Sequence, residues 1–135
     1  MAGLSGTPLA RKLDIRPGCA LLLDGSPAGF AIDDLPPDVV ASHRAGEGPY
    51  DVILCFSRDR AQLARRWPRL HPRTTPAGAL WIAWPKRASG VPTDLDENGV
   101  REFALGHGRV DVKVAAIDET WSGLKNVIRK ADRPG

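Results

Sequence analysis

The sequence predicts one α/β domain of three layers, with a mainly parallel sheet that ends in a C-terminal antiparallel hairpin. Two observations carry this prediction. Two continuous apolar runs, Tyr50–Phe56 and Ala79–Trp84, are typical of strands that are buried on both faces. Helical patterns separate most of the strand candidates, as expected where crossover helices cover both faces of a sheet.

The first part of the chain predicts a helix and a buried strand. Residues 1–8 are interpreted as an N-terminal tail, and Leu9–Ile15 as a short helix. The turn-forming residues Arg16-Pro17-Gly18 end that helix. The continuous apolar run Cys19–Leu23 then predicts a strand that is buried on both faces.

Two short elements precede the central strand. Phe30–Leu35 predicts a short helix, because Pro36-Pro37 would end it. Val39–Ser42 predicts a short strand. Tyr50–Phe56, which is apolar and β-branched, is the clearest strand of the chain.

The middle of the chain predicts a helix between two strands. Ser57–Trp67 is interpreted as an amphipathic helix. The face that we expect to be buried carries Leu63, Trp67 and Leu70. The turn formed by residues 75–78 then leads into the strand Ala79–Trp84.

A second helix is predicted to begin at Thr93. Asp96 occupies the third position after it, as in a capping box. Either Gly106 or Gly108 would end this helix, since glycine is common just after a helix.

The C-terminal hairpin is predicted from two strand candidates that a short turn separates. Val110–Ile117 alternates between apolar and polar residues, and Leu124–Lys130 returns after a turn at Thr120–Gly123. Residues 131–135 are interpreted as a tail. We expect the return strand to lie between Ala79–Trp84 and Val110–Ile117.

Composition limits the class of protein. The chain has 135 residues, of which 42% are hydrophobic, and a formal net charge of +3. This length is sufficient for one domain with its own core, so we assign residues 1–135 to a single domain. No apolar run reaches the roughly 18 residues of a membrane span, and no secretory signal is visible. We therefore expect a cytoplasmic protein without a membrane segment.

The cysteines and histidines show no metal-binding pattern. Cys19 and Cys55 lie in apolar surroundings, as is typical of buried free thiols in a reducing compartment. The histidines His43, His71 and His107 are too far apart to form a local ligand motif. We predict no metal site, and the sequence identifies neither a cofactor nor a catalytic group.

Three stretches resemble the class I methyltransferase fold, which is Rossmann-like. Residues 13–23 are similar to the approach to its first strand, Tyr50–Ile53 to its fourth, and residues 75–82 to the turn into its fifth. Two features depart from that fold. The loop at residues 24–29 has only two glycines, and Ser42-His43-Arg44 replaces the acidic residue that would hold the ribose of adenosylmethionine.

Two longer blocks carry a second resemblance. Residues 84–95 and 118–125 resemble the signature blocks of the DUF 3052 family, and this resemblance extends over nearly the whole chain. The family is bacterial and has no assigned reaction. The resemblance therefore implies a bacterial, cytoplasmic protein and no particular chemistry.

The carboxyl edge of the sheet is the expected binding site, because ligands of open parallel sheets bind beyond the carboxyl ends of the strands. The loops that follow the predicted strands should meet there. Their cations, hydroxyl groups, glycine and indole ring would suit a small anionic or nucleotide-like ligand. The predicted ligand-binding residues are Asp24, Ser26, Lys86, Arg87, Ser89, Gly90, Thr93, Glu119, Trp121 and Ser122. We further expect Lys86 and Trp121 to line one cavity.

Structural explanations for several of these residues remain open. Thr93 and Asp94 could simply cap a helix. Trp121 could be a core anchor of the hairpin. Asp118 and Lys125 could form a cross-strand ion pair.

No nucleophile–base pair is visible, so we predict a small-ligand-binding or regulatory module rather than a catalyst. One alternative is a divergent methyltransferase-like enzyme. Another is a protein-interaction domain that uses Arg65, Arg66 and Arg69 against an acidic partner. We do not expect nucleic-acid binding, since a helix rich in arginine is most often a solvated face.

Overall fold

The computed structural model describes residues 7–134. The strands are β1 (Ala20–Asp24), β2 (Val40–Ser42), β3 (Tyr50–Phe56), β4 (Thr74–Pro85), β5 (Val110–Ala116) and β6 (Trp121–Val127). The α-helices are α1 (Leu9–Lys12), α2 (Arg60–Leu70) and α3 (Glu97–Gly106). Short 3₁₀ helices are η1 (His71–Arg73), η2 (Arg87–Ser89) and η3 (Lys130–Asp132). Within residues 7–134, no helix is long and apolar enough to cross a membrane.

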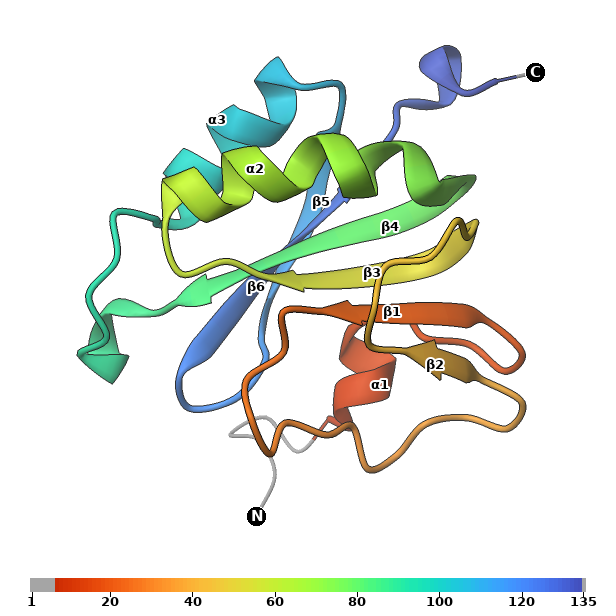
Figure 1. The fold of residues 1–135 in the computed structure, drawn as a ribbon, viewed down its shortest axis with the longest axis horizontal. Coiled ribbons are helices and arrows are strands. Elements are labelled where there is room, and N and C mark those ends of the chain that lie inside the picture. Colours follow the sequence, from red (N-terminus) through yellow and green to blue (C-terminus); the bar gives the residue numbers. More distant parts are fainter. Residues whose placement is uncertain (1–6, 135) are drawn as a thin grey trace.

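All six strands form one sheet in the order β2-β1-β3-β4-β6-β5 (Figure 1). The pairs β1–β2, β1–β3 and β3–β4 are parallel, whereas β6 runs antiparallel to both β4 and β5. The sheet is therefore mixed rather than mainly parallel, because the last strand runs against both of its neighbours. As predicted, the apolar runs of β3 and β4 lie side by side and parallel at the centre.

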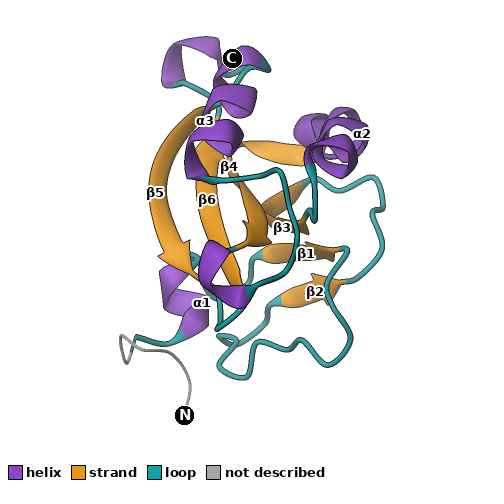
Figure 2. Cartoon of the chain, turned by 90° about the vertical axis from the view of Figure 1, so that its left-hand side faces the viewer, coloured by secondary structure: helices purple, strands orange, loops and turns teal. Residues whose placement is uncertain are grey.

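Helices lie on both faces of the sheet, with α1 on one face and α2 and α3 on the other (Figure 2). Alternate residues of β1 supply both cores. Leu21 and Leu23 pack toward α1, and Leu22 packs toward α2. This arrangement explains why β1 is apolar throughout instead of alternating.

The predicted helix Phe30–Leu35 does not form. This segment has no regular secondary structure, and its Phe30 ring lies 4.9 Å from the Phe56 ring. Ile32 is buried in the same core. Phe30 and Ile32 both pack in this core, and residues two positions apart point to the same side in an extended chain. Six residues are also too few to offset the cost of nucleating a helix.

Helix α2 begins three residues later than predicted, because Asp59 is its N-cap. The Asp59 carboxylate accepts a hydrogen bond of 2.8 Å from the Gln62 N–H. The face with Leu63, Trp67 and Leu70 is buried, as the apolar spacing predicts.

Helix α3 begins at Glu97, so the prediction that Thr93 starts it is wrong. Asp96 is the N-cap and accepts from the Gly99 N–H at 2.7 Å. Thr93 lies in the preceding turn, where its hydroxyl oxygen accepts from the Leu95 N–H. Burial of Leu95 against the α2–α3 core holds residues 93–95 outside the helix.

Strands β4 and β6 also differ from the predicted boundaries. β4 begins at Thr74, which pairs with Tyr50 across an irregularity in the ladder, so residues 75–78 are part of a strand. β6 begins at Trp121, which pairs with Pro85, and not at Leu124. Pairing with a long neighbour extends both strands beyond their apolar runs.

Asp14 ties the N-terminal segment to the C-terminal hairpin. Its carboxylate accepts hydrogen bonds from Lys125 Nζ at 2.7 Å and from Lys113 Nζ at 3.2 Å. Partial burial alone would raise the pKa of Asp14, but the two ammonium groups together outweigh burial and lower the pKa from 3.8. Lys125 thus pairs with Asp14 and not, as the sequence suggested, with Asp118.

Arg109 links η1, β4 and β6 and has no carboxylate partner among residues 7–134. The residue is 1% exposed, and burial lowers its pKa to about 10. Its guanidinium donates to His71 Nδ1 at 2.9 Å and to Thr74 Oγ1 at 2.7 Å. It also donates to the carbonyl oxygens of His71, Gly78 and Asn126. Five acceptors surround this one buried cation. The planar guanidinium, with its five N–H donors, can serve all of them, which another side chain could not easily do.

We therefore predict that Arg109→Lys destabilises the fold. A lysine cannot reach these acceptors together, so buried acceptors lose their donors, and we expect the free energy of unfolding to fall by about 3 kcal/mol. Urea denaturation measures this change. The matched control is Arg65→Lys on the exposed side of α2, which should leave the midpoint unchanged. Equal midpoints for both variants would contradict the role of Arg109.

The same network predicts a pH dependence. Burial lowers the pKa of His71 from 6.5, and the neighbouring Arg109 and His107 add to the effect. The unfolded chain takes up a proton near pH 6.5, whereas the folded chain does so only at lower pH. Stability is therefore complete above that pH and decreases as the pH falls through it. Urea midpoints on either side of pH 6.5 should show this slope, and His71→Gln should reduce it.

Candidate functional site

The two sequence blocks that were predicted to meet do lie together at the carboxyl edge. The Lys86 N–H donates to the Thr120 carbonyl at 2.8 Å, immediately beyond the paired ends of β4 and β6. This contact follows from the position of β6 beside β4. The edge also contains Asp24 at the end of β1 and the buried Ser57 just beyond β3.

Trp121 is a core residue, and a ligand-binding role for it stays a prediction. It is 6% exposed, and its ring meets the Phe56 ring edge-on at 5.1 Å. It belongs to the α1-side core, whereas Trp84 belongs to the α2-side core. We expected Lys86 and Trp121 to line one cavity, but neither residue lines either of the two pockets described below.

The remaining residues of the hairpin turn have structural surroundings. The Asp118 carboxylate accepts from the N–H groups of Thr120 and Trp121, both at 2.8 Å, and thereby shapes the turn. Glu119 is exposed in this turn, and Ser122 is half-buried opposite Trp84 in the ladder. A binding role for Glu119 and Ser122 stays a prediction.

The loop after β4 folds on itself through η2. The Ser89 hydroxyl donates to the Lys86 carbonyl at 2.7 Å and accepts from the Val91 N–H at 3.2 Å. Gly90 follows with a φ of 75°, a left-handed conformation that glycine adopts without strain. Ser89 and Gly90 therefore shape the loop, and Lys86 is half-buried at its start.

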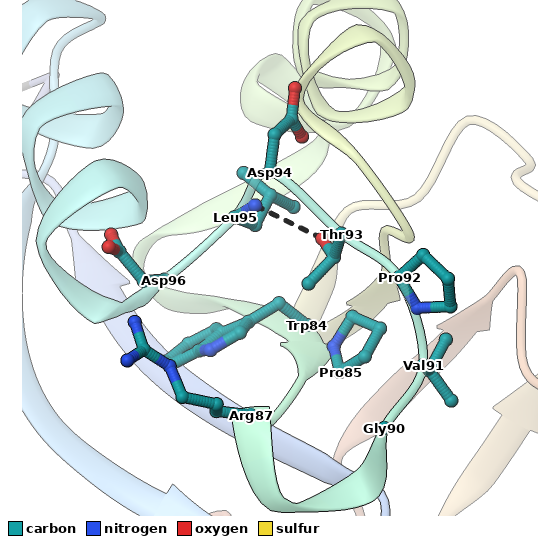
Figure 3. Close-up of a pocket in the computed structure, with 10 residues that line it drawn as sticks. All are labelled: Trp84, Pro85, Arg87, Gly90, Val91, Pro92, Thr93, Asp94, Leu95 and Asp96. Atoms are coloured by element: carbon teal, nitrogen blue, oxygen red, sulfur yellow. Dashed lines mark hydrogen bonds between the residues drawn. The ribbon is translucent and has the colours of Figure 1, made fainter.

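A pocket of about 360 Å³ lies between this loop and the start of α3 (Figure 3). We call it the Trp84 pocket; it is lined by Trp84, Pro85, Arg87, Gly90, Val91, Pro92, Thr93, Asp94, Leu95 and Asp96. Three of the predicted ligand-binding residues, Arg87, Gly90 and Thr93, thus lie around one pocket. The others do not line it.

Asp24 lies at the switch point of the sheet, where the connections from β1 and β3 leave in opposite directions. It is 7% exposed. Its carboxylate lies 3.7 Å from Arg66 Nε and 3.8 Å from Arg69 Nη2. One buried carboxylate is therefore shared by two guanidinium groups from α2.

Cys55 is buried beside Asp24, in surroundings that disfavour its thiolate. Its Sγ lies 3.8 Å from an Asp24 carboxylate oxygen and 3.5 Å from Ser57 Oγ. Burial raises the pKa of the Cys55 thiol to about 11. The thiol therefore stays protonated at neutral pH, whereas nucleophilic attack requires the thiolate.

Arg66 fills the space above Gly25, the first glycine after β1. Gly25 has a φ of +69°, and a Cβ there would lie 2.5 Å from Arg66 Nη1. The same guanidinium donates to the Phe56 carbonyl at the end of β3. Arg66 is therefore turned inward, so only Arg65 and Arg69 of the predicted arginine face are exposed.

A second pocket, of about 390 Å³, lies beside this cluster. We call it the arginine pocket; it is lined by Asp24, His43, Arg44, Ala45, Arg69 and Arg73. The sequence predicted Arg69 as part of a basic face but did not bring Arg44 and Arg73 to it. The basic pair His43-Arg44 after β2 was the available signal. Ser26 lies in the loop after β1 and lines neither pocket.

The side chains at this edge bear on whether adenosylmethionine or a metal ion could bind there. The β1 end departs from a typical adenosylmethionine site in two respects: the Arg66 guanidinium lies over Gly25, and Arg44, instead of an acid, follows β2. Among residues 7–134, no group of three or more His, Cys, Asp or Glu side chains is arranged to hold a metal ion.

Comparison with protein-family models gives no match, and no curated protein matches the chain. The expected membership of the DUF 3052 family is therefore not confirmed. The bacterial origin and the cytoplasmic location also stay predictions.

Solved structures do show similar folds. A candidate methyltransferase from Thermoplasma acidophilum matches with a TM-score of 0.55 and 9% identity, over 96% of this chain and 77% of that one. The N-methyltransferase NodS from Bradyrhizobium japonicum WM9 matches with a TM-score of 0.52 and 12% identity, over 91% of this chain and 98% of that one. At such identities the similarity concerns the fold alone: the chain has an α/β, Rossmann-like fold similar to that of methyltransferases.

Proposed function

We propose that this chain binds a small anionic ligand that carries a phosphate group, such as a nucleotide, in the arginine pocket. The observation that carries the proposal is the convergence of Arg44, Arg69 and Arg73 on one pocket in which Asp24 is the single acidic residue. The guanidinium groups come from the loop after β2, from α2 and from η1. Three cations against one carboxylate leave an excess of positive charge.

The geometry of the arginines supports an anion more than a structural ion-pair network. Asp24 is already shared with Arg66, and the Arg69 side chain remains 60% exposed. Arg44 has no hydrogen-bond or ion-pair partner among residues 7–134. Arg73 donates to the Gly46 carbonyl at 2.6 Å, which holds the loop of Arg44 beside η1. Guanidinium groups with unused donors match phosphate oxygens well.

The position of the pocket also supports this class of ligand. It lies at the carboxyl ends of β1 and β2, the side on which open α/β sheets bind ligands. In dinucleotide-binding folds, an acid after the second strand holds ribose hydroxyls, whereas an arginine accommodates a phosphate. Arg44 at this position favours phosphate. The volume lies within the roughly 300–1,000 Å³ range of small-molecule pockets.

The experiment is a calorimetric titration with inorganic phosphate, pyrophosphate and ATP. We expect saturable binding that weakens about tenfold in Arg44→Gln and in Arg69→Gln, since each removes a charged hydrogen-bond donor. The matched control is Arg65→Gln, which lies on the same helix as Arg69 but does not line the pocket. Equal losses in all three variants would indicate nonspecific attraction and contradict the proposal.

Adenosylmethionine-dependent methyl transfer is the second candidate, and the similarity of the fold to two methyltransferase structures favours it. The Arg66 guanidinium over Gly25 argues against it. We expect no saturable heat when adenosylmethionine or its demethylated product is titrated into the protein. Clear binding of either compound would place methyl transfer ahead of anion binding.

A further inference from the structure

The Trp84 pocket contains two hydrogen-bond donors that nothing in residues 7–134 satisfies. Trp84 is 5% exposed, and its indole N–H has no hydrogen-bond partner there. The indoles of Trp67 and Trp81 differ, since each donates to a carbonyl oxygen. Arg87 is exposed, and its guanidinium likewise has no partner in this range. Figure 3 shows the Trp84 ring and the Arg87 side chain on the same side of the pocket.

The two acids of the pocket are committed to the ends of helices. Asp94 accepts from the N–H of Arg60, the first residue of α2, at 2.8 Å. Asp96 accepts from the Gly99 N–H in the first turn of α3 at 2.7 Å. Carboxylates at these positions are stabilised by the positive ends of the helix dipoles. Each acid thus uses one carboxylate oxygen at a helix end, whereas the Trp84 N–H and the Arg87 guanidinium are reached by solvent, where an acceptor on a ligand can replace water.

The rest of the wall is largely apolar. Pro85 and Leu95 are buried, while Val91 and Pro92 are exposed at the rim. Leu95 also packs in the core between α2 and α3, so this wall is held in place by the fold. The pocket therefore combines a fixed apolar surface with two donors, one of them charged.

We propose that the Trp84 pocket is a second binding site, for a small monocarboxylate with an apolar body. One carboxylate oxygen accepts from the Trp84 indole N–H, and the other accepts from the Arg87 guanidinium. The apolar body lies against Pro85, Val91 and Leu95. A monocarboxylate brings one negative charge, which Arg87 balances, whereas a phosphate dianion would bring two negative charges beside the carboxylates of Asp94 and Asp96.

This site is independent of the arginine pocket. The two pockets share no residue, and their expected ligands differ in charge and in apolar surface. Failure of phosphate to bind would therefore leave the Trp84 pocket unaffected, and failure of a carboxylate would leave the arginine pocket unaffected.

The experiment follows indole N–H signals by two-dimensional NMR during titration with benzoate and with hexanoate. The chain has four tryptophans, and the signal missing in Trp84→Phe identifies Trp84. In the wild type, we expect one or both probes to shift this signal in a saturable way, while inorganic phosphate leaves it in place. By calorimetry, Arg87→Gln should weaken binding about tenfold, and Trp84→Phe, which keeps an aromatic ring, about fivefold.

The matched control is Lys86→Gln. Lys86 is the neighbour of Arg87 but does not line the pocket, and its backbone contact with Thr120 is kept. Its affinity should equal that of the wild type. Because Arg87 is exposed, Arg87→Gln tests the site even if Trp84→Phe folds poorly. A Trp84 signal that neither probe shifts, or equal losses in Arg87→Gln and Lys86→Gln, would overturn the proposal.

Discussion

The insertion of β6 between β4 and β5 is the constraint on which the carboxyl edge depends. β6 pairs antiparallel with both neighbours and so satisfies the backbone groups on the outer side of β4. Gly123 suits the close approach of β6 to its neighbours, since a Cβ there would lie 3.0 Å from the Ile117 side chain and 3.2 Å from Trp81, both tight contacts. The same pairing places Trp121 against Phe56 and brings the turn before it to Lys86.

The polar side chains at the carboxyl edge fall into two groups, those with hydrogen-bond partners within the fold and those without. Asp94, Asp96 and Asp118 serve backbone N–H groups at helix ends and in a turn. The arginines have no equivalent set of partners, because Asp24 is the single acid of their pocket. Arginine donors without a carboxylate of their own therefore remain in the arginine pocket, which is the physical basis for expecting a ligand that supplies acceptors.

Similarity of fold at such low identity does not by itself establish similarity of chemistry. Methyltransferase structures match the arrangement of its elements, yet Arg66 occupies the space over Gly25 that a ligand would approach. Arg66 also contacts Asp24 and donates to the Phe56 carbonyl, so its guanidinium links the carboxyl ends of β1 and β3. Function has to be argued from such side chains, because one fold supports many activities.

Local pattern alone determined the strand Tyr50–Phe56 and the buried face of α2, because apolar spacing reports burial directly. The carboxyl edge and the contact between the 84–95 and 118–125 blocks also followed from sequence, through the rules of chain connection. Tertiary structure alone decided that Trp121 is core, that Arg66 turns inward and that Arg44 joins Arg69. A side chain's partners come from residues distant in the sequence, and no local periodicity encodes them.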